Sequence, residues 1–169
     1  MMSVFEHSEY DGHEHVAFYQ DKTTGLKAII AVHNSNLGSA LGGCRMWPYA
    51  SDEEALRDVL RLSKGMTYKA AMAGLKQGGG KAVIIGNPRT EKTPEKMLSM
   101  GKFIDSLSGQ YISAEDSGLT VDDLKVMSRQ TKYVSGIHAN YHINSEPADG
   151  NPAPSTAYGV YVGLKTSVE

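Results

Sequence analysis

The pattern of apolar and polar residues along the chain predicts strands and helices in alternation. Two apolar runs at residues 16–20 and 26–33 are separated by a short turn that contains glycine, which predicts a β-hairpin. Apolar residues then recur at helical spacing and predict a helix over about residues 52–73. Ser51, with Glu54 three residues later, predicts a capping box at the start of that helix.

The second half of the chain continues the alternation. The run at residues 81–86 is apolar without polar alternation, which predicts a strand covered on both faces. Pro94 lies at the first position of a helix that Gly109 ends. The same reasoning predicts a strand at residues 111–114, a helix capped by Thr120, a short strand at residues 133–134 and a helix at residues 155–168.

Two glycine-rich stretches predict irregular structure. Residues 34–49 combine Gly42 and Gly43 with other special residues, and this composition predicts a long loop. The three glycines at residues 78–80 predict a turn that a ligand can approach closely, because no Cβ is in the way. Gly65 inside the first helix is expected to allow close packing.

Alternating strands and helices predict an α/β fold. We expect three layers, α/β/α, around a mixed and mostly parallel sheet with an antiparallel N-terminal hairpin at one edge. The length of 169 residues suits one such domain.

Charge and composition exclude several classes of function. The formal net charge is −2 and the basic residues are dispersed, which argues against nucleic acid or an anionic membrane as the main partner. The N-terminus has neither the basic nor the apolar segment of a signal peptide, and no apolar run is long enough to span a bilayer. The single cysteine, Cys44, cannot form an internal disulfide, so we expect a cytoplasmic protein.

Three charged residues stand where chemistry can take place. Lys69 lies near the end of the first helix, and Lys81 follows the three glycines at the start of a buried strand. A lysine in such a position is readily desolvated, and desolvated lysines can serve as general bases. Asp116 follows a strand at its C-terminal end, where ligand sites of open α/β sheets lie. From the residues alone, a solvated lysine on a turn and a capping or turn carboxylate are the more ordinary interpretations.

Other site motifs are weak or missing. No Gly-x-Gly-x-x-Gly occurs in the chain, and the glycines before Lys81 precede a strand, unlike those of a P-loop. His13 and His15 are two residues apart without further ligands nearby. His138, His142 and Glu146 fall in a polar segment that is more simply an extended surface loop. We therefore expect no metal site.

Five stretches together resemble the N-terminal, substrate-binding domain of the Glu/Leu/Phe/Val amino-acid dehydrogenases, above all the members that act on leucine. The specific part is the order of a lysine, Gly-Gly-Gly-Lys and Ala-Glu-Asp. The resemblance extends from about residue 5 to the end. The stretches are residues 41–49, 65–75, 78–86, 111–116 and 151–159.

The resemblance implies roles for particular residues. Lys81 would be the catalytic lysine that polarises the reacting carbon and activates water, and Asp116 would exchange protons with the substrate amino group. Lys69 would hold the substrate carboxylate, and Thr156 would approach the nicotinamide. The remaining substrate-binding residues that it implies are Gly42 and Gly43 at the carboxylate end, and Leu41, Met66 and Ala114 in an apolar pocket.

The reaction implied is the reversible, NAD-dependent oxidative deamination of L-leucine, or another branched-chain amino acid, to the 2-oxo acid and ammonia. The resemblance assigns residues 1–150 to substrate binding and assembly into a homo-oligomer, and residues 151–169 to the start of an interdomain helix. The Rossmann domain that binds most of the NAD is expected after residue 169 and is absent here, so this chain alone should not turn over. The segment at residues 138–150 is longer than the family pattern.

Three alternatives remain at this point. The chain could be a stand-alone module that binds small amino or oxo acids or mediates assembly. It could belong to a dehydrogenase that acts on phenylalanine or valine, because these side chains differ by only a few methylene groups of pocket volume. A third alternative is an anion-binding metalloprotein that uses the scattered histidines.

Overall fold

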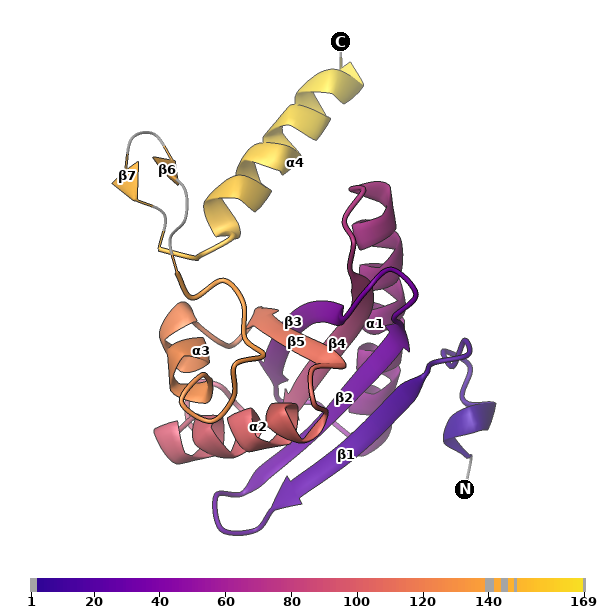
Figure 1. The fold of residues 1–169 in the computed structure, drawn as a ribbon, viewed down its shortest axis with the longest axis vertical. Coiled ribbons are helices and arrows are strands. Elements are labelled where there is room, and N and C mark those ends of the chain that lie inside the picture. The colour runs from indigo at the N-terminus through magenta and orange to yellow at the C-terminus, as the bar shows by residue number, and fades with distance from the viewer. Residues whose placement is uncertain (1–2, 139–141, 144–145, 148, 169) are drawn as a thin grey trace.

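A computed structural model describes residues 3–138, 142–143, 146–147 and 149–168. The described elements begin with a 3₁₀ turn at Val4–Glu6 and end with a helix at Ala153–Val168 (Figure 1). The strands are β1 (His15–Asp21), β2 (Leu26–Asn34), β3 (Ala40–Trp47), β4 (Gly78–Ile85), β5 (Tyr111–Glu115), β6 (His142–Ile143) and β7 (Glu146–Pro147), and the helices are α1 (Asp52–Met72), α2 (Pro94–Ser106), α3 (Val121–Met127) and α4 (Ala153–Val168).

The main sheet of the described residues has five strands in the order β1-β2-β4-β3-β5. β1 pairs antiparallel with β2 as the predicted hairpin, and β2 pairs antiparallel with β4. β3 lies parallel to both β4 and β5. The α/β fold with a mixed sheet is therefore confirmed, but its pairings are divided evenly between the two directions instead of being mostly parallel.

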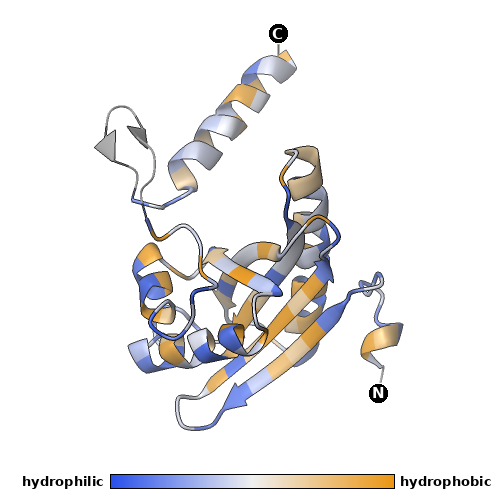
Figure 2. Cartoon of the chain, in the orientation of Figure 1, coloured by the Kyte–Doolittle hydropathy of each residue, from blue (hydrophilic) through white to orange (hydrophobic). Residues whose placement is uncertain are grey.

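Helices cover both faces of this sheet, as the three-layer prediction requires (Figure 1). One face packs on α1, where Ile29 and Val83 of the sheet meet Val59 and Leu60 of the helix. The other face packs on α2 and α3 around the larger core, which includes the fully buried Tyr111. Figure 2 shows hydrophobic residues concentrated along the strands between these layers.

The two glycine-rich stretches that predicted irregular structure are strands. Residues 40–47, predicted as part of a loop, form β3, and the glycines at residues 78–80 begin β4. A Cβ on Gly42 would lie 1.7 Å from the Gly80 carbonyl oxygen, and a Cβ on Gly79 would lie 2.1 Å from the Thr67 nitrogen. These glycines therefore allow close approach between neighbouring elements, and they do not mark turns.

The predicted starts of α1, α2 and α3 are correct, with one difference in detail at α1. The Ser51 side chain accepts from the Glu54 N–H at 3.1 Å, as predicted. The Glu54 carboxylate, however, accepts from the Ala50 N–H at 2.7 Å, so the reciprocal half of the box is displaced by one residue. A complete capping box forms instead at α3, between Thr120 and Asp123.

Two further predictions differ from the structure. A Cβ on Gly65 would meet no atom within 4 Å, so this exposed glycine does not serve close packing. The strand predicted at residues 133–134 is reduced to a single parallel bridge between Val134 and Ser113.

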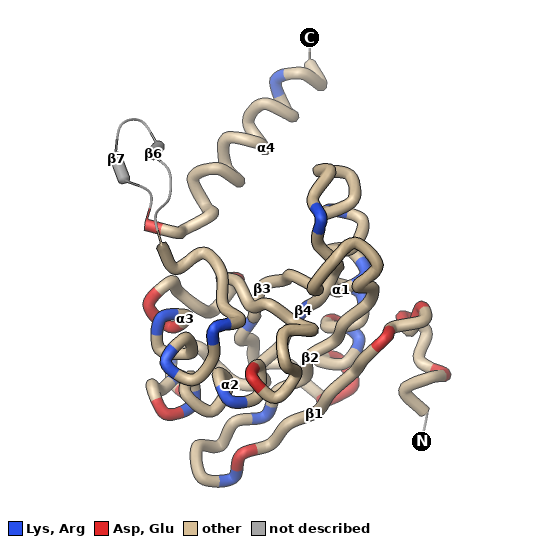
Figure 3. Tube along the Cα trace, in the orientation of Figure 1, with Lys and Arg blue, Asp and Glu red and all other residues tan. Residues whose placement is uncertain are grey.

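The last helix stands apart from the sheet (Figure 1). α4 begins two residues before its predicted start and buries none of its described residues. Its large apolar side chains are exposed, among them Tyr158, Tyr161 and Leu164. Figure 3 shows charges of both signs spread over the rest of the chain but almost none on α4. None of the described helices is both long and apolar enough to cross a membrane.

Candidate active site

A cavity of about 820 Å³ opens between the parallel strands, the C-terminal half of α1 and the start of α4. The structure brings together at this cavity every predicted site residue except Gly42. We call this cavity the cleft. The predicted residues that line it are Leu41, Gly43, Met66, Lys69, Lys81, Ala114, Asp116 and Thr156.

The consecutive glycines of β3 do different things. Gly42 is directed at the backbone of Gly80 and its carbonyl oxygen accepts a hydrogen bond of 2.8 Å from the buried Tyr111 hydroxyl. Gly43 faces the cleft, where a Cβ would lie 2.6 Å from the Cβ of Asp116. The missing side chain at Gly43 thus leaves the space that Asp116 occupies.

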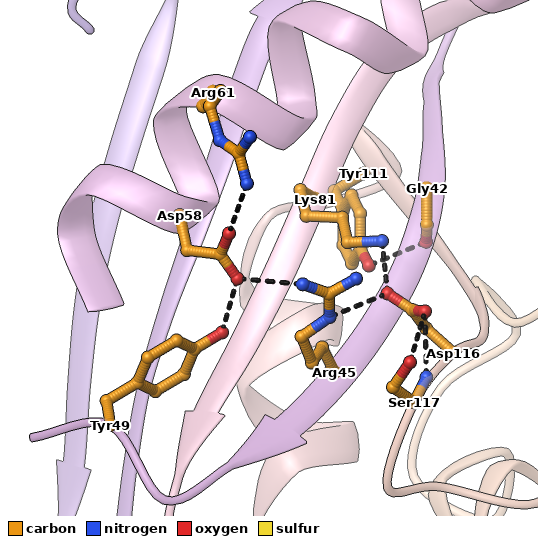
Figure 4. A network of polar contacts seen from close by, with 9 residues as sticks. All are labelled: Gly42, Arg45, Tyr49, Asp58, Arg61, Lys81, Tyr111, Asp116 and Ser117. Carbon is orange, nitrogen blue, oxygen red and sulfur yellow. Dashed lines mark hydrogen bonds and ion pairs between the residues drawn. The ribbon is translucent and has the colours of Figure 1, made fainter. Parts of the chain in front are cut away.

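The centre of the site is an ion pair between Lys81 and Asp116 (Figure 4). Lys81 is only 6% exposed, and its Nζ contacts Oδ2 of Asp116. The other carboxylate oxygen accepts from the Ser117 N–H at 2.7 Å. Burial alone would raise the pKa of Asp116, but the Lys81 charge, this hydrogen bond and the Arg45 charge outweigh burial and lower it. Asp116 is therefore a carboxylate at neutral pH.

A second cation and a second carboxylate extend this pair (Figure 4). Arg45 Nε lies 3.4 Å from Asp116 Oδ2, and Arg45 Nη1 donates to Asp58 Oδ2 at 3.0 Å. Asp58 also accepts from the Tyr49 hydroxyl at 2.7 Å and from Arg61 at 3.2 Å. Burial alone would lower the pKa of Arg45, but the carboxylates of Asp116 and Asp58 raise it.

This extension was missed by sequence reasoning, in which Arg45 fell within the stretch predicted as a loop. Arg45 in β3 and Asp58 in the next element, α1, lie 13 residues apart, but Asp116, which follows β5, is far from both along the chain. The available signal was an arginine two positions after Gly43, because residues two apart on a strand share a face. Glu115, also missed, lines the cleft, and burial followed by the Asp116 charge raises its pKa.

Lys69 and the apolar residues form the other side of the cleft. Lys69 is exposed in the last turn of α1, and its ammonium has no ion pair or hydrogen bond within the described part of the chain. Met66 lies one turn earlier on the same helix, and Leu41 and Ala114 approach from β3 and β5. The cleft thus joins the Lys69 ammonium, an apolar wall and the Lys81–Asp116 ion pair.

The histidines that suggested a metal have other partners. His13 Nε2 lies 3.0 Å from the Leu60 carbonyl oxygen, and His15 Nδ1 lies 3.0 Å from Oε1 of Gln110. Among the residues that the structure describes, no group of three His, Cys, Asp or Glu could hold a metal ion. The side chains of His142 and Glu146 lie outside the described residues.

Comparison with known proteins shows close relatives over nearly the whole chain. Leucine dehydrogenase from Geobacillus stearothermophilus is 52% identical over 168 residues, which are 99% of this chain and 44% of that protein. Phenylalanine dehydrogenase from Caldalkalibacillus thermarum is 49% identical over 97% of this chain and 43% of that protein. The chain spans less than half the length of the curated relatives that it matches.

Solved structures agree with the fold described above. L-tryptophan dehydrogenase from Nostoc punctiforme superimposes with a TM-score of 0.73 at 46% identity, covering 94% of this chain and 42% of that one. A hetero-hexameric glutamate dehydrogenase from Thermus thermophilus has a TM-score of 0.57 at 20% identity, covering 70% of this chain and 30% of that one, and shows the fold alone. The sequence pattern described as "Glu/Leu/Phe/Val dehydrogenase, dimerisation domain" matches residues 13–133. On this evidence, the chain belongs to the Glu/Leu/Phe/Val dehydrogenase family.

Proposed function

We propose that this chain is the substrate-binding part of an NAD-dependent amino-acid dehydrogenase that converts L-leucine reversibly to its 2-oxo acid and ammonia. The observation that carries the proposal is the meeting of Lys69, Lys81 and Asp116 in one cleft with an apolar wall. An α-amino acid presents a carboxylate, an amino group and a side chain, and the cleft offers a complement to each.

Each charged residue has a task that follows from its surroundings. Lys69, which has no partner among the described residues, binds the substrate carboxylate. Asp116 is ionised and accepts a proton from the substrate ammonium. Lys81 polarises the carbon that becomes the carbonyl and activates the water that attacks it. Because Lys81 and Asp116 contact each other, protons taken from substrate and water pass between them.

When bound, NAD would supply the acceptor for the hydride that leaves the substrate Cα. The described part of the chain fits only one end of this cofactor. The cleft volume of about 820 Å³ lies in the upper part of the range for ligand pockets and exceeds the need of one small amino acid. Thr156 of α4 lines it and would contact the nicotinamide end. We propose that residues 1–150 form the substrate domain and that residues 151–169 lead to a separate NAD domain; the chain spans only 44% of its leucine dehydrogenase relative, which supports this division.

Leucine is the proposed substrate because the apolar wall is built from Leu41, Met66 and Ala114. The small Ala114 leaves space beside the longer Met66 for a branched side chain. One methylene group changes discrimination by only about 1–3 kcal/mol, so valine is expected as a slower substrate. We also propose that the enzyme is a cytoplasmic homo-oligomer, in which the exposed edge of β1 provides a pairing surface.

The test is leucine-dependent NAD reduction by the full-length product of the gene, with Lys81→Ala beside it. Loss of a general base costs about 10²- to 10⁴-fold, so Lys81→Ala should lose at least two orders of magnitude in kcat. Lys102→Ala, at an exposed position of α2, is the matched control and should retain activity.

The outcomes separate the alternatives. Robust activity of Lys81→Ala would show that Lys81 is structural and that the site is assigned wrongly. The wild-type product could instead be folded and bind leucine, seen as a chemical-shift change at the cleft, without reducing NAD. It would then be a binding module. A higher kcat/KM for phenylalanine or valine than for leucine would overturn the substrate assignment alone.

A further inference from the structure

Arg45 occupies a position between two carboxylates that the proposed reaction does not yet explain. Its guanidinium lies 3.4 Å from Asp116 on one side and 3.0 Å from Asp58 on the other (Figure 4). The side chains of Arg45, Asp116 and Asp58 are 25%, 19% and 14% exposed. Charges this far from water interact strongly, so their arrangement affects the chemistry of Asp116.

One donor atom beside Asp116, the Nε of Arg45, is left without a hydrogen bond. Arg45 Nε is buried and makes no hydrogen bond within the described part of the chain. The acceptor that faces it is Asp116 Oδ2, at a distance of 3.4 Å. Hydrogen bonds at catalytic groups are often long without substrate and shorten when substrate is bound. A movement of a few tenths of an ångström would therefore satisfy Arg45 Nε.

The two cations beside Asp116 differ in one chemical respect. Lys81 must lose and regain a proton if it acts as the base of the reaction. A guanidinium stays protonated throughout, because its pKa lies far above any pH at which the enzyme works. During the interval in which Lys81 is neutral, the partly buried carboxylate of Asp116 would lose its main partner. Arg45 is the cation that remains.

We propose that Arg45 is a positioning residue, which keeps the Asp116 carboxylate ionised and in place while Lys81 changes its charge. This inference rests on the proposed function for its catalytic meaning. Arg45 does not itself line the cleft but contacts Asp116, which does, so it acts through Asp116.

Asp58 and Tyr49 hold Arg45 for this task. Asp58 on α1 accepts from Arg45 and from the Tyr49 hydroxyl, at 3.0 and 2.7 Å. Asp58 thus fixes the far end of the guanidinium at the price of a negative charge near Asp116. Holding Arg45 in place lowers the pKa of Asp116, whereas the negative charge of Asp58 raises it, and variants can separate these two effects.

The decisive measurement is the titration of the Asp116 carboxyl carbon by ¹³C NMR in this chain, identified by the loss of its signal in Asp116→Asn. In Lys81→Met, the midpoint should remain acidic because Arg45 is still present. Adding Arg45→Met to that variant should raise the midpoint further, toward or above the ordinary value for aspartate. Adding Arg57→Met instead is the matched control, since Arg57 lies on α1 and pairs with Glu9 at 3.7 Å.

Two single variants give the opposite signs. Arg45→Met should raise the Asp116 midpoint. Asp58→Asn should leave it unchanged or lower it, because asparagine keeps an oxygen that can accept from Arg45 while the neighbouring negative charge is removed. Disruption of the fold would shift the Asp116 midpoint in the same direction in both variants. An unchanged midpoint in folded Arg45→Met, or a rise in Asp58→Asn, would overturn the proposal. If Arg45→Met does not fold, Arg45→Lys keeps the charge, and a raised midpoint there would equally overturn it.

Kinetics of the full-length product then test the catalytic meaning. Arg45→Met should lower kcat about 10- to 100-fold with little change in KM, because displacement of a catalytic group by about 1 Å has an effect of that size. The acid limb of its pH profile should move to higher pH, which a merely structural role would not cause. Wild-type enzyme without any deaminating activity would refute the proposed function, while the titration would still decide the role of Arg45. If the wild type is active and the acid limb of the Arg45→Met pH profile does not move, the inference about Arg45 alone is refuted.

Discussion

Replacing Gly43 with alanine is the smallest change that tests how the site is built. The added Cβ would lie 2.6 Å from Asp116 Cβ and 3.0 Å from the Glu115 carbonyl oxygen. Carbon atoms in contact are normally about 3.5–4.0 Å apart. Neither neighbour is the free end of a flexible side chain, so β5 has to move from β3 by about 1 Å.

That movement has two measurable consequences. Overpacking of a tight contact typically costs about 1–3 kcal/mol of unfolding free energy, and the backbone contact with Glu115 places Gly43→Ala toward the upper end. The same movement separates Asp116 from Lys81, and a misplacement of about 1 Å can cost about 100-fold in rate. We therefore expect a loss of about 2–3 kcal/mol in stability and of about 100-fold in kcat.

Urea unfolding of this chain measures the first loss, and NAD reduction by the full-length product measures the second. Gly65→Ala is the matched control, because it makes the same chemical change where no atom lies within 4 Å of the new methyl group. Since glycine is unfavourable inside a helix, Gly65→Ala should stabilise the chain by about 0.5–1 kcal/mol. Wild-type stability and kcat in Gly43→Ala would refute the claim that Gly43 makes room for Asp116.

Three further predictions concern the rest of the domain. Burial lowers the pKa of His13 in the folded chain. The stability that neutral His13 contributes is therefore complete above the unfolded pKa of about 6.5, and it is lost as the pH falls toward the lower folded pKa. His13→Gln should flatten the dependence of the urea midpoint on pH over that range. Tyr111→Phe removes the hydroxyl that donates to the Gly42 carbonyl oxygen, and it should lower the free energy of chemical unfolding by about 1–2 kcal/mol. Thr93→Ala removes the N-cap of α2 and should cost about 1 kcal/mol in the same assay, and Thr93→Ser should restore most of it.

The helices and the hairpin could be predicted from the sequence because their signals are local. Ser51 and Thr120 hydrogen-bond to residues three positions away, and apolar periodicity reports which face of a helix is buried. The glycine-rich strands could not be predicted in this way. Glycine is a turn signal by local rules, whereas Gly42 and Gly79 are required by atoms of Gly80 and Thr67 that approach only in the folded chain.

The site shows the same division. Resemblance to the family brought together Lys69, Lys81 and Asp116, which the structure places around one cleft. The contacts of Arg45 with Asp58 and Asp116 depend on the register of β3 against its neighbours and on the packing of α1. Local patterns do not encode that register, so the polar network could be found only in the structure.

The strand order also determines when the site can form during folding. β3 is made before β4 and β5, yet both of its partners in the sheet come later in the chain. During synthesis β3 therefore stays unpaired until β4 and β5 have been made. Pairing between strands that are distant along the chain is slow. β5 arrives last and carries Asp116 to its position over Gly43. The Lys81–Asp116 contact is thus completed by the final strand of the sheet, so a folding intermediate can contain the hairpin and α1 without this ion pair.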